Sequence, residues 1–414
     1  MNRLSNLITR HDPTSCIVIL IAGFIFLNPF PHVTAFKEIS FYSAMGLIGL
    51  AILLKKRGFS FDTPLSTAFV CILLWACIGI LFAINKPNTI QDIYAHLIKY
   101  LAVYFMIVNY FDSREKVNAL SWVIILSTSC FCLWSVSNYY FLLGRPFTDQ
   151  LGILVFKEIP TNIIGIVTVF GILLSLQKLN GKTAGWLRNA LLAMVIVMTL
   201  TTLLTQTRGA MIALFSALII LSFRNRKILI FIIFVTILLS LLPIKSRLTP
   251  SGIADKLKQD ERIGIALNYI EVIKDFPIQG IGFGLQSYAD ESFMRIYYNR
   301  VDPALRPGII YAAPHNFVID ILVRLGIVGL ALYLYVLYRA FGMILALSKD
   351  DRDDERRGWG LTFFAALVAF LIQGMLENVH SAPPAVVFYS LLAMITILWK
   401  RYRIEQMERG INTA

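Results

Sequence analysis

The chain has 414 residues, of which 57% are hydrophobic and 15% are charged, and its mean hydropathy is +0.69. Soluble domains usually contain about 25% charged residues, so the composition excludes an ordinary soluble domain and indicates a polytopic membrane protein. The formal net charge of +13 is concentrated in short segments between apolar runs, where it orients the chain and meets anionic lipid. We therefore predict contact with membrane lipids and no nucleic-acid partner.

Long apolar runs predict about twelve transmembrane helices, because a helix needs about 20 apolar residues to cross a bilayer. The predicted spans are 14–35, 39–54, 64–83, 93–110, 119–143, 160–177, 187–204, 209–223, 227–243, 315–347, 360–376 and 383–399. The sequence thus predicts an all-α, polytopic membrane helix bundle in which residues 1–414 form a single integral membrane domain.

The distribution of lysine and arginine orients the predicted helices. With the N-terminus inside, 21 of these residues fall in inner segments and five in the short outer segments, as the positive-inside rule requires. Both termini are therefore expected in the cytoplasm. Residues 1–13 are polar and no small-residue cleavage site follows the first apolar run, which favours an uncleaved first helix. The five cysteines lack metal-ligand spacing, and neither a metal nor a cofactor is predicted.

One outer segment, residues 243–313 between the ninth and tenth helices, is much longer than the others. Ile263, Leu267, Ile270 and Ile273 recur there at helical spacing, which predicts an amphipathic helix that lies on the membrane surface or caps the bundle. The glycine-rich stretch 277–284 lacks the strand and helix of a dinucleotide-binding fingerprint. It is interpreted as a turn that lets the backbone pack closely.

Ionisable residues gather at the outer ends of the predicted helices. His315 is the first residue of the tenth predicted span, and histidine is the side chain best suited to proton transfer near neutral pH. Arg208 lies in an outer turn, and Arg262 opens the amphipathic helix. Arginine is the preferred partner of phosphate, so these side chains suit a lipid-linked diphosphate at headgroup depth. The alternatives are a snorkelling Arg208 and a solvated, charged turn around Arg262.

Further candidates lie near the same outer ends. Lys99 in the fourth span is either another diphosphate contact or a snorkelling or structurally paired side chain. Glu377 and His380 in the last outer loop could orient His315 or bind an acceptor sugar, and Asn316 adjoins the histidine.

Several of these motifs together resemble the O-antigen ligase (WaaL) and polymerase superfamily. They are His315-Asn316, the turn Thr207-Arg208-Gly209, the glycine-rich segment 277–284 and the run from Arg324 to Gly329, in a twelve-span layout. Many members carry an acidic residue near the position of Arg324, so no family role is assigned to it. Its spacing of four residues from Asp320 favours structural pairing within one helix.

The resemblance implies a glycosyltransferase of lipopolysaccharide assembly. It would move O-antigen glycan from undecaprenyl diphosphate to a hydroxyl of lipid A-core, at the periplasmic face of the bacterial inner membrane. His315 would be the general base, and Arg208 and Arg262 would hold the diphosphate leaving group. The first outer loop offers only Glu38 as a carboxylate, so a metal-independent reaction is expected, and single displacement would invert the anomeric centre.

Three other functions remain open from the sequence. A polymerase that joins carrier-linked repeat units would use the same base and arginines with a different acceptor, and a protein-directed oligosaccharyltransferase is another enzyme alternative. A transporter of lipid-linked glycan would predict broken helices at matching positions in two halves of the chain. The ionisable residues instead gather at one face.

Overall fold

The computed structural model describes residues 13–56, 58–152, 161–181, 183–241, 261–288, 290–311, 313–377, 379 and 382–410. Within these ranges the regular secondary structure is entirely helical. The helices of the bundle are α2 (Pro13–Leu27), α3 (Thr34–Leu53), α4 (Ser66–Gly79), α5 (Lys86–Asp92), η1 (Ile93–Ile98), α6 (Lys99–Tyr110), α7 (Arg114–Val136), η2 (Ser137–Leu142), α8 (Thr161–Asn180), α9 (Gly185–Leu204), α10 (Arg208–Ser222), α11 (Lys227–Leu241), α16 (Phe317–Ser348), α17 (Asp354–Gly374) and α18 (Pro384–Glu408).

Each predicted apolar run corresponds to a helix or to a continuous series of helices, and the predicted class, a polytopic helical membrane protein, is confirmed. Within the described residues, eight helices are long and apolar enough to cross a membrane, fewer than the twelve predicted. The runs at α2, α4, α10 and α11 form shorter apolar helices. At about 1.5 Å per residue, a 15-residue helix rises only about 22 Å, which is less than the ~30 Å hydrocarbon layer.

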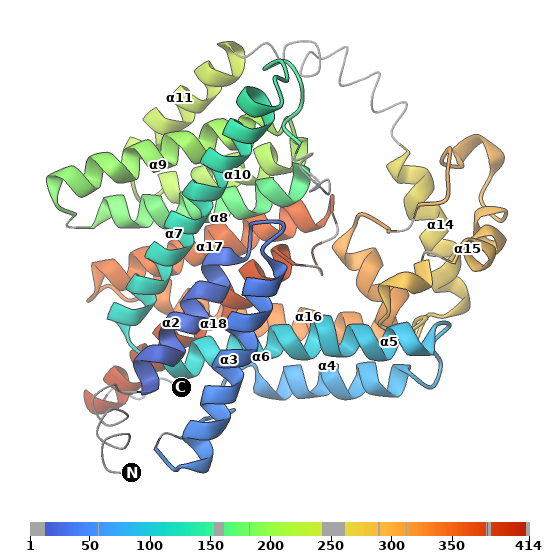
Figure 1. Cartoon of the computed structure of the whole chain (residues 1–414), viewed down its shortest axis with the longest axis horizontal. Helices are drawn as coiled ribbons and strands as arrows, with labels where there is room; N and C mark the ends of the chain where they lie inside the picture. The colour runs from blue at the N-terminus through green and yellow to red at the C-terminus, as the bar shows by residue number, and fades with distance from the viewer. Residues whose placement is uncertain are drawn as a thin grey trace.

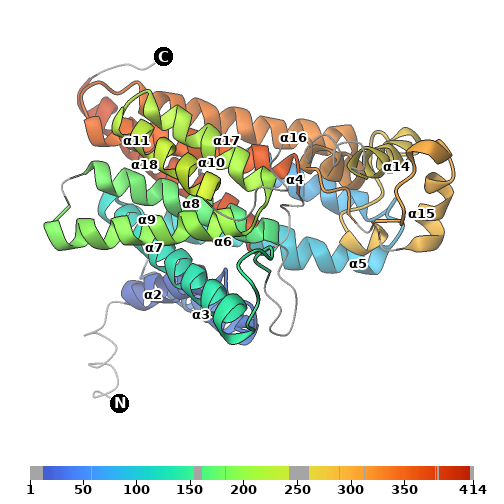
Figure 2. The same ribbon diagram turned by 90° about the horizontal axis from the view of Figure 1, so that it is seen from above.

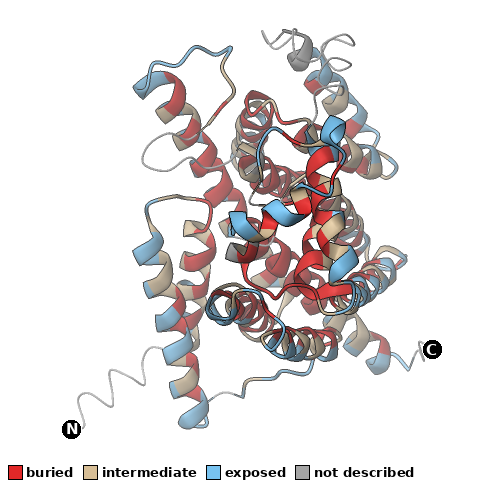
Figure 3. Ribbon diagram, turned by 90° about the vertical axis from the view of Figure 1, so that its right-hand side faces the viewer, coloured by how far each residue is buried: buried red, intermediate tan, exposed pale blue. Residues whose placement is uncertain are grey.

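The core of the bundle is built around α18. From Pro384 to Leu398 every residue of this helix is buried, as expected for a helix that is apolar on all sides and surrounded by others. Helices α6, α16, α17, α8 and α7 all contact it. In Figure 3 the buried residues accordingly lie towards the middle of the bundle, with exposed ones at the periphery.

The described residues from 261 to 311 form a lobe at one end of the bundle (Figures 1 and 2). Its helices are α14 (Arg262–Asp275), η3 (Leu285–Tyr288), α15 (Glu291–Tyr298) and η4 (Pro303–Leu305). The lobe has a small core of its own, which also includes one residue of α16: Ile265, Tyr269, Val272, Ile281, Met294, Tyr297 and Val323.

The amphipathic helix predicted in this segment is present as α14 (Arg262–Asp275). Ile263 is 61% exposed and Ile270 38% exposed, whereas Ile265, Tyr269 and Val272 are buried. The buried positions follow an i, i+4, i+7 pattern that includes a tyrosine. The aliphatic positions therefore differ from those that pack against the rest of the lobe.

The glycine-rich stretch packs against a break in α16 at Gly326, where φ is +64°. The amide of Ile281 donates to the carbonyl of Val323 at 2.8 Å, and that of Ile327 donates to Pro277 at 2.8 Å. A Cβ on Gly326 would lie 2.0 Å from the carbonyl oxygen of Ile278. Only glycine permits this close approach, in agreement with the turn interpretation.

The break in α16 is also held by a buried charged pair. Asp320 and Arg324 lie 3.5 Å apart and are almost fully buried, and Arg324 Nε donates to the carbonyl of Phe283 at 2.8 Å. The hydrogen bond from Arg324 to Phe283 attaches the lobe to α16.

Candidate active site

Three helix ends meet beside the lobe: the starts of α10 and α16 and the end of α17. Asn316 caps α16, because its Oδ1 accepts hydrogen bonds from the amides of Val318 and Ile319 at 2.9 and 3.1 Å. Its Nδ2 donates to the carbonyl of Met375 at 3.0 Å. Asn316 therefore has a local role as an N-cap and also joins α16 to the end of α17.

The start of α10 approaches the same place. A Cβ on Gly209 would lie 3.1 Å from Leu376 Cδ1, so the residue after Arg208 packs against the residue before Glu377. This close approach explains why a glycine suits the Thr-Arg-Gly turn. It also brings Arg208 into the neighbourhood of Glu377.

Glu377 lies between two of the predicted site residues. Its Oε2 is 3.4 Å from His315 Nδ1, and its Oε1 is 3.5 Å from Arg262 Nη2. The Glu377 side chain is 13% exposed, whereas those of His315 and Arg262 are 38% and 49% exposed. The carboxylate is thus more deeply placed than the two groups it contacts, which remain open to a substrate.

His315 is held in an unusual backbone conformation, with φ at +49°. Non-glycine residues adopt this region rarely, and it occurs disproportionately at functional sites. The ring of Tyr311 packs edge-on against His315 with centroids 6.3 Å apart, and the Tyr311 hydroxyl donates a hydrogen bond to Glu261. Since Nδ1 of His315 faces Glu377, Nε2 is the nitrogen available to a substrate hydroxyl.

Tyr311 and Glu261 were not predicted as site residues. The hydrogen bond to Glu261, together with partial burial, raises the pKa of the Tyr311 hydroxyl above its usual value. The two residues lie 50 positions apart, so no local sequence signal connects them.

Arg208 is the first residue of α10, and its Nη2 is buried without a hydrogen-bond partner among the described residues. A buried, unpaired guanidinium nitrogen is costly, which is understandable where an anionic ligand completes the contact. The starts of α10, α14 and α16 also carry the positive ends of helix dipoles. Together with Arg208 and Arg262 they make this junction suitable for binding phosphate.

The structure does not bring Lys99 to this junction. Its ammonium lies 2.5 Å from Glu38 Oε1 and 5.2 Å from the ring centroid of Phe41. These contacts agree with the alternative in which Lys99 is a structurally paired side chain. His380 lies outside the described residues.

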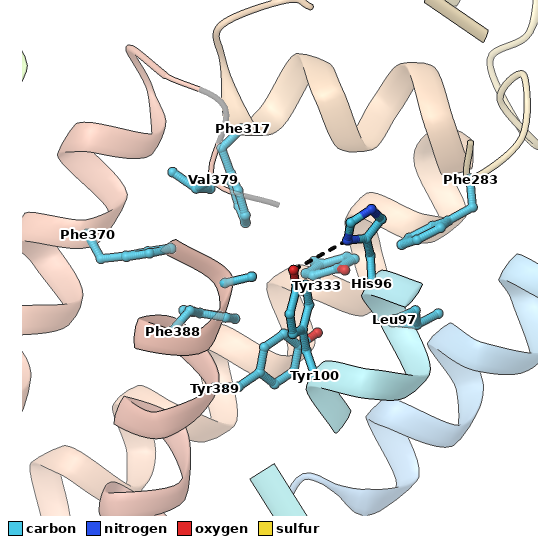
Figure 4. A pocket seen from close by; sticks show the side chains of 11 residues that line it. His96, Leu97, Tyr100, Phe283, Phe317, Tyr333, Phe370, Val379, Phe388 and Tyr389 are labelled. Carbon is cyan, nitrogen blue, oxygen red and sulfur yellow. Dashed lines mark hydrogen bonds between the residues drawn. The ribbon is translucent and has the colours of Figure 1, made fainter. Parts of the chain in front are cut away.

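A small cavity of about 20 Å³ lies next to the junction and is lined by Phe317 and Val379, which follow His315 and Glu377 in the chain. Figure 4 shows His96 and several aromatic side chains around it. His96 Nδ1 is 3.3 Å from the hydroxyl of Tyr100 and its Nε2 is 3.6 Å from Asp92. The volume suits about one water molecule.

Among the described side chains, no group of three or more His, Cys, Asp or Glu residues could hold a metal ion. The chemical groups at the junction are instead an imidazole, a carboxylate, two guanidinium groups and the amides of helix starts.

The fold and this junction define a polytopic helical membrane protein with a cationic site where several helices end. Residues 193–334 match the family model described as O-antigen ligase. This match supports placing the chain in the O-antigen ligase superfamily, as its motifs predicted, and suggests glycan transfer of the ligase or polymerase type. The matched region includes Arg208, Arg262, His315 and Asn316.

No curated protein matches the chain. A solved structure described as "Structural coordination of polymerization and crosslinking by a peptidoglycan synthase complex" is similar, with 16% identity and a TM-score of 0.43. The similarity covers 82% of this chain and 97% of that chain.

Proposed function

We propose that this protein is an O-antigen ligase. It moves glycan from undecaprenyl diphosphate to a hydroxyl of lipid A-core, by an inverting and metal-independent reaction. The observation that supports this proposal best is the junction at which Glu377 contacts both His315 and Arg262 while a buried nitrogen of Arg208 has no partner among the described residues.

In this proposal His315 is the general base. Contact with Glu377 at Nδ1 orients the ring and leaves Nε2 to take the proton from the acceptor hydroxyl. The acceptor oxygen then forms a bond to the anomeric carbon, and the bond from that carbon to the phosphate oxygen breaks. Attack opposite the leaving group inverts the anomeric centre.

Arg208 and Arg262 bind the diphosphate and stabilise the negative charge that develops on it as the bond breaks. The 3.5 Å contact of Arg262 with Glu377 is at the long limit for a hydrogen bond. We assign Lys99 to structural pairing with Glu38. His380 remains a prediction, with a role in orienting His315 or binding the acceptor sugar.

The same proposal sets the orientation in the membrane. The large loop 243–313 and the junction face the periplasm, and both termini are in the cytoplasm of a cell with an inner membrane. The bias of lysine and arginine towards the opposite segments supports this orientation.

The test uses purified protein with glycan-diphosphate-polyprenol and lipid A-core, in parallel with donor alone. We expect glycan on lipid A-core, and we expect His315→Ala to lower the rate by about 10²- to 10⁴-fold, the usual contribution of a general base. His32→Ala is the control, since His32 also has a positive φ and is exposed.

Each alternative outcome has a distinct meaning. Longer carrier-linked chains from donor alone would identify a polymerase that uses the same chemistry. Glycan movement across a membrane without transfer would identify a transporter, and retention of anomeric configuration in the product would exclude single displacement.

A further inference from the structure

A tyrosine and a carboxylate that the proposed reaction does not use lie beside His315. The rings of Tyr311 and His315 pack edge-on with their centroids 6.3 Å apart, and the Tyr311 side chain is partly exposed. Its hydroxyl donates a hydrogen bond to Oε2 of Glu261, the exposed residue that directly precedes α14. Both side chains are therefore accessible to a ligand that reaches His315.

The Tyr311 ring is held in place at both of its ends. Its hydroxyl is bonded to Glu261, and its backbone carbonyl accepts a hydrogen bond from the hydroxyl of Tyr269 at 2.8 Å. Tyr269 is fully buried in the core of the lobe. A side chain that is already fixed loses little conformational freedom when a ligand packs against it. Tyr311 is thus a preorganised aromatic surface next to a polar site.

Glu261 is fixed to the same segment of chain. Its Oε1 accepts a hydrogen bond from the amide of Gly308 at 3.1 Å, and a Cβ on Gly308 would lie 2.9 Å from this oxygen. Glycine at position 308 therefore permits the close approach. An ionised carboxylate can accept about four hydrogen bonds, so Glu261 can still accept from hydroxyl groups of a ligand in addition to Gly308 and Tyr311.

The chemistry of this pair suits a sugar. An acceptor hydroxyl that gives its proton to His315 lies about 2.6 to 3.2 Å from the ring nitrogen, so the sugar that carries this hydroxyl lies against the side chains around His315. A sugar ring presents C–H groups on its faces and hydroxyls at its edges, which match an aromatic surface beside a hydrogen-bond acceptor. The diphosphate of the donor would instead be repelled by the Glu261 carboxylate.

We propose that Tyr311 and Glu261 form the subsite for the acceptor sugar. The sugar that carries the attacking hydroxyl packs one face on the Tyr311 ring, and another of its hydroxyls donates a hydrogen bond to Glu261. This inference rests on the proposed function, because it assigns the acceptor side of that site. The arginines bind the charged donor, and the tyrosine and glutamate select the uncharged part of the acceptor.

The experiment measures acceptor binding and transfer separately, with the full-length protein in detergent. Lipid-free core oligosaccharide is titrated onto the protein by saturation-transfer NMR, which gives a Kd without donor or turnover. Lipid A-core is then varied at saturating glycan-diphosphate-polyprenol, which gives kcat and the acceptor KM. We expect the oligosaccharide to bind the unaltered protein, and its failure to bind would overturn the proposal.

Three variants locate the subsite. Tyr311→Leu removes the aromatic surface and should raise the oligosaccharide Kd and the acceptor KM about tenfold, whereas the donor KM stays the same. Tyr311→Phe keeps the ring and should retain most of the affinity. Glu261→Gln changes an exposed side chain, so it should fold normally, and replacing a charged acceptor by a neutral one should raise the Kd about fivefold.

Tyr298→Leu is the matched control. The Tyr298 hydroxyl donates to the carbonyl of Pro307 at 2.7 Å, so this tyrosine anchors the same segment of chain as Tyr311. It packs against Arg306 and is not part of the proposed subsite. The oligosaccharide Kd and the acceptor KM should therefore be unchanged in Tyr298→Leu.

Several results would overturn the proposal. A lower kcat in Tyr311→Leu with unchanged Kd and acceptor KM would mean that Tyr311 supports His315 and does not bind the acceptor. Equal effects of Tyr311→Leu and Tyr298→Leu would show that both act by loosening the segment. If Tyr311→Leu did not fold, an unchanged Kd in Glu261→Gln would exclude the subsite.

Failure of this inference is distinguishable from failure of the proposed function. If the unaltered protein bound the oligosaccharide and Tyr311→Leu weakened binding, but no glycan were transferred, the subsite would stand and the proposed function would fail. If glycan were transferred and neither Tyr311→Leu nor Glu261→Gln changed the Kd or the acceptor KM, the proposed function would stand and the subsite would fail.

Discussion

The arginines near the two ends of α17 differ in how fully carboxylates neutralise them. At its start, Arg114 and Arg356 contact carboxylates at 2.6 to 2.9 Å. At its end, Arg262 is 3.5 Å from Glu377, and a buried nitrogen of Arg208 has no partner among the described residues. Arginines that are saturated by carboxylates stabilise the fold, whereas an arginine with an unpaired buried donor can bind an anion. The contrast can be tested by comparing stability with activity at each end.

The largest effect on stability is expected for Arg356→Ala. The Arg356 side chain is 7% exposed and that of its partner Asp350 is 4% exposed, and breaking a buried pair by removing one partner costs about 3 to 5 kcal/mol. Chemical unfolding in detergent measures this loss. Arg357→Ala is the matched control, because Arg357 is 51% exposed and its partner Asp351 is 85% exposed. An equally small change in both variants would contradict the assignment of Arg356 to the fold.

Arg208→Ala should show the opposite behaviour. We expect kcat to fall by about 10²- to 10³-fold, as when one stabilising donor is removed from an anionic transition state. The free energy of unfolding should change little, because Nη2 has no partner to lose among the described residues. Arg208→Lys keeps the charge without the planar fork and should recover part of the rate. If Arg208→Ala lowered the free energy of unfolding but left the rate of glycan transfer unchanged, the role of Arg208 would be structural.

Glu377→Gln should have an intermediate effect on activity. The substitution removes the charge that contacts both His315 and Arg262, and a charge-assisted hydrogen bond contributes about 1.5 to 3 kcal/mol. We therefore expect kcat/KM to fall by about 10- to 100-fold. Glu291→Gln, in an exposed pair with Arg295 on α15, is the control. Equal activity of the two variants would argue against a positioning role for Glu377.

Tyr311→Phe should have the smallest effect. The hydrogen bond to Glu261 and partial burial raise the pKa of Tyr311, so the contact stabilises the protein below the usual tyrosine pKa of about 10 and is lost as the pH rises further. Because Glu261 is exposed, we expect a loss of less than about 1 kcal/mol. Unfolding measured against pH should show the difference from the unaltered protein disappearing in alkali. A difference in the free energy of unfolding that stays the same at every pH would contradict this explanation.

Local sequence patterns predicted the helices well, because each depends on a continuous run of residues. The apolar runs located the helices of the bundle, and an asparagine before such a run is a typical cap, as Asn316 is. The spacing of apolar residues was less informative about which face of a helix packs against the rest of the protein. For α14 the aliphatic spacing located the helix but did not show that Ile265 and Tyr269 are the residues that pack within the lobe.

The sequence by itself determined the membrane class, the positions of the helices and the identity of the chemically capable residues. Only the tertiary structure decided which of them meet: Arg262 and Glu377 are 115 positions apart, and Lys99 and Glu38 are 61 apart. Hydropathy and helical spacing describe neighbours along one helix. Contacts between residues so far apart in the sequence depend instead on how the ends of helices pack against each other, as at Gly209 and Leu376. This packing brings Arg262, His315 and Glu377 together and leaves Lys99 outside the junction.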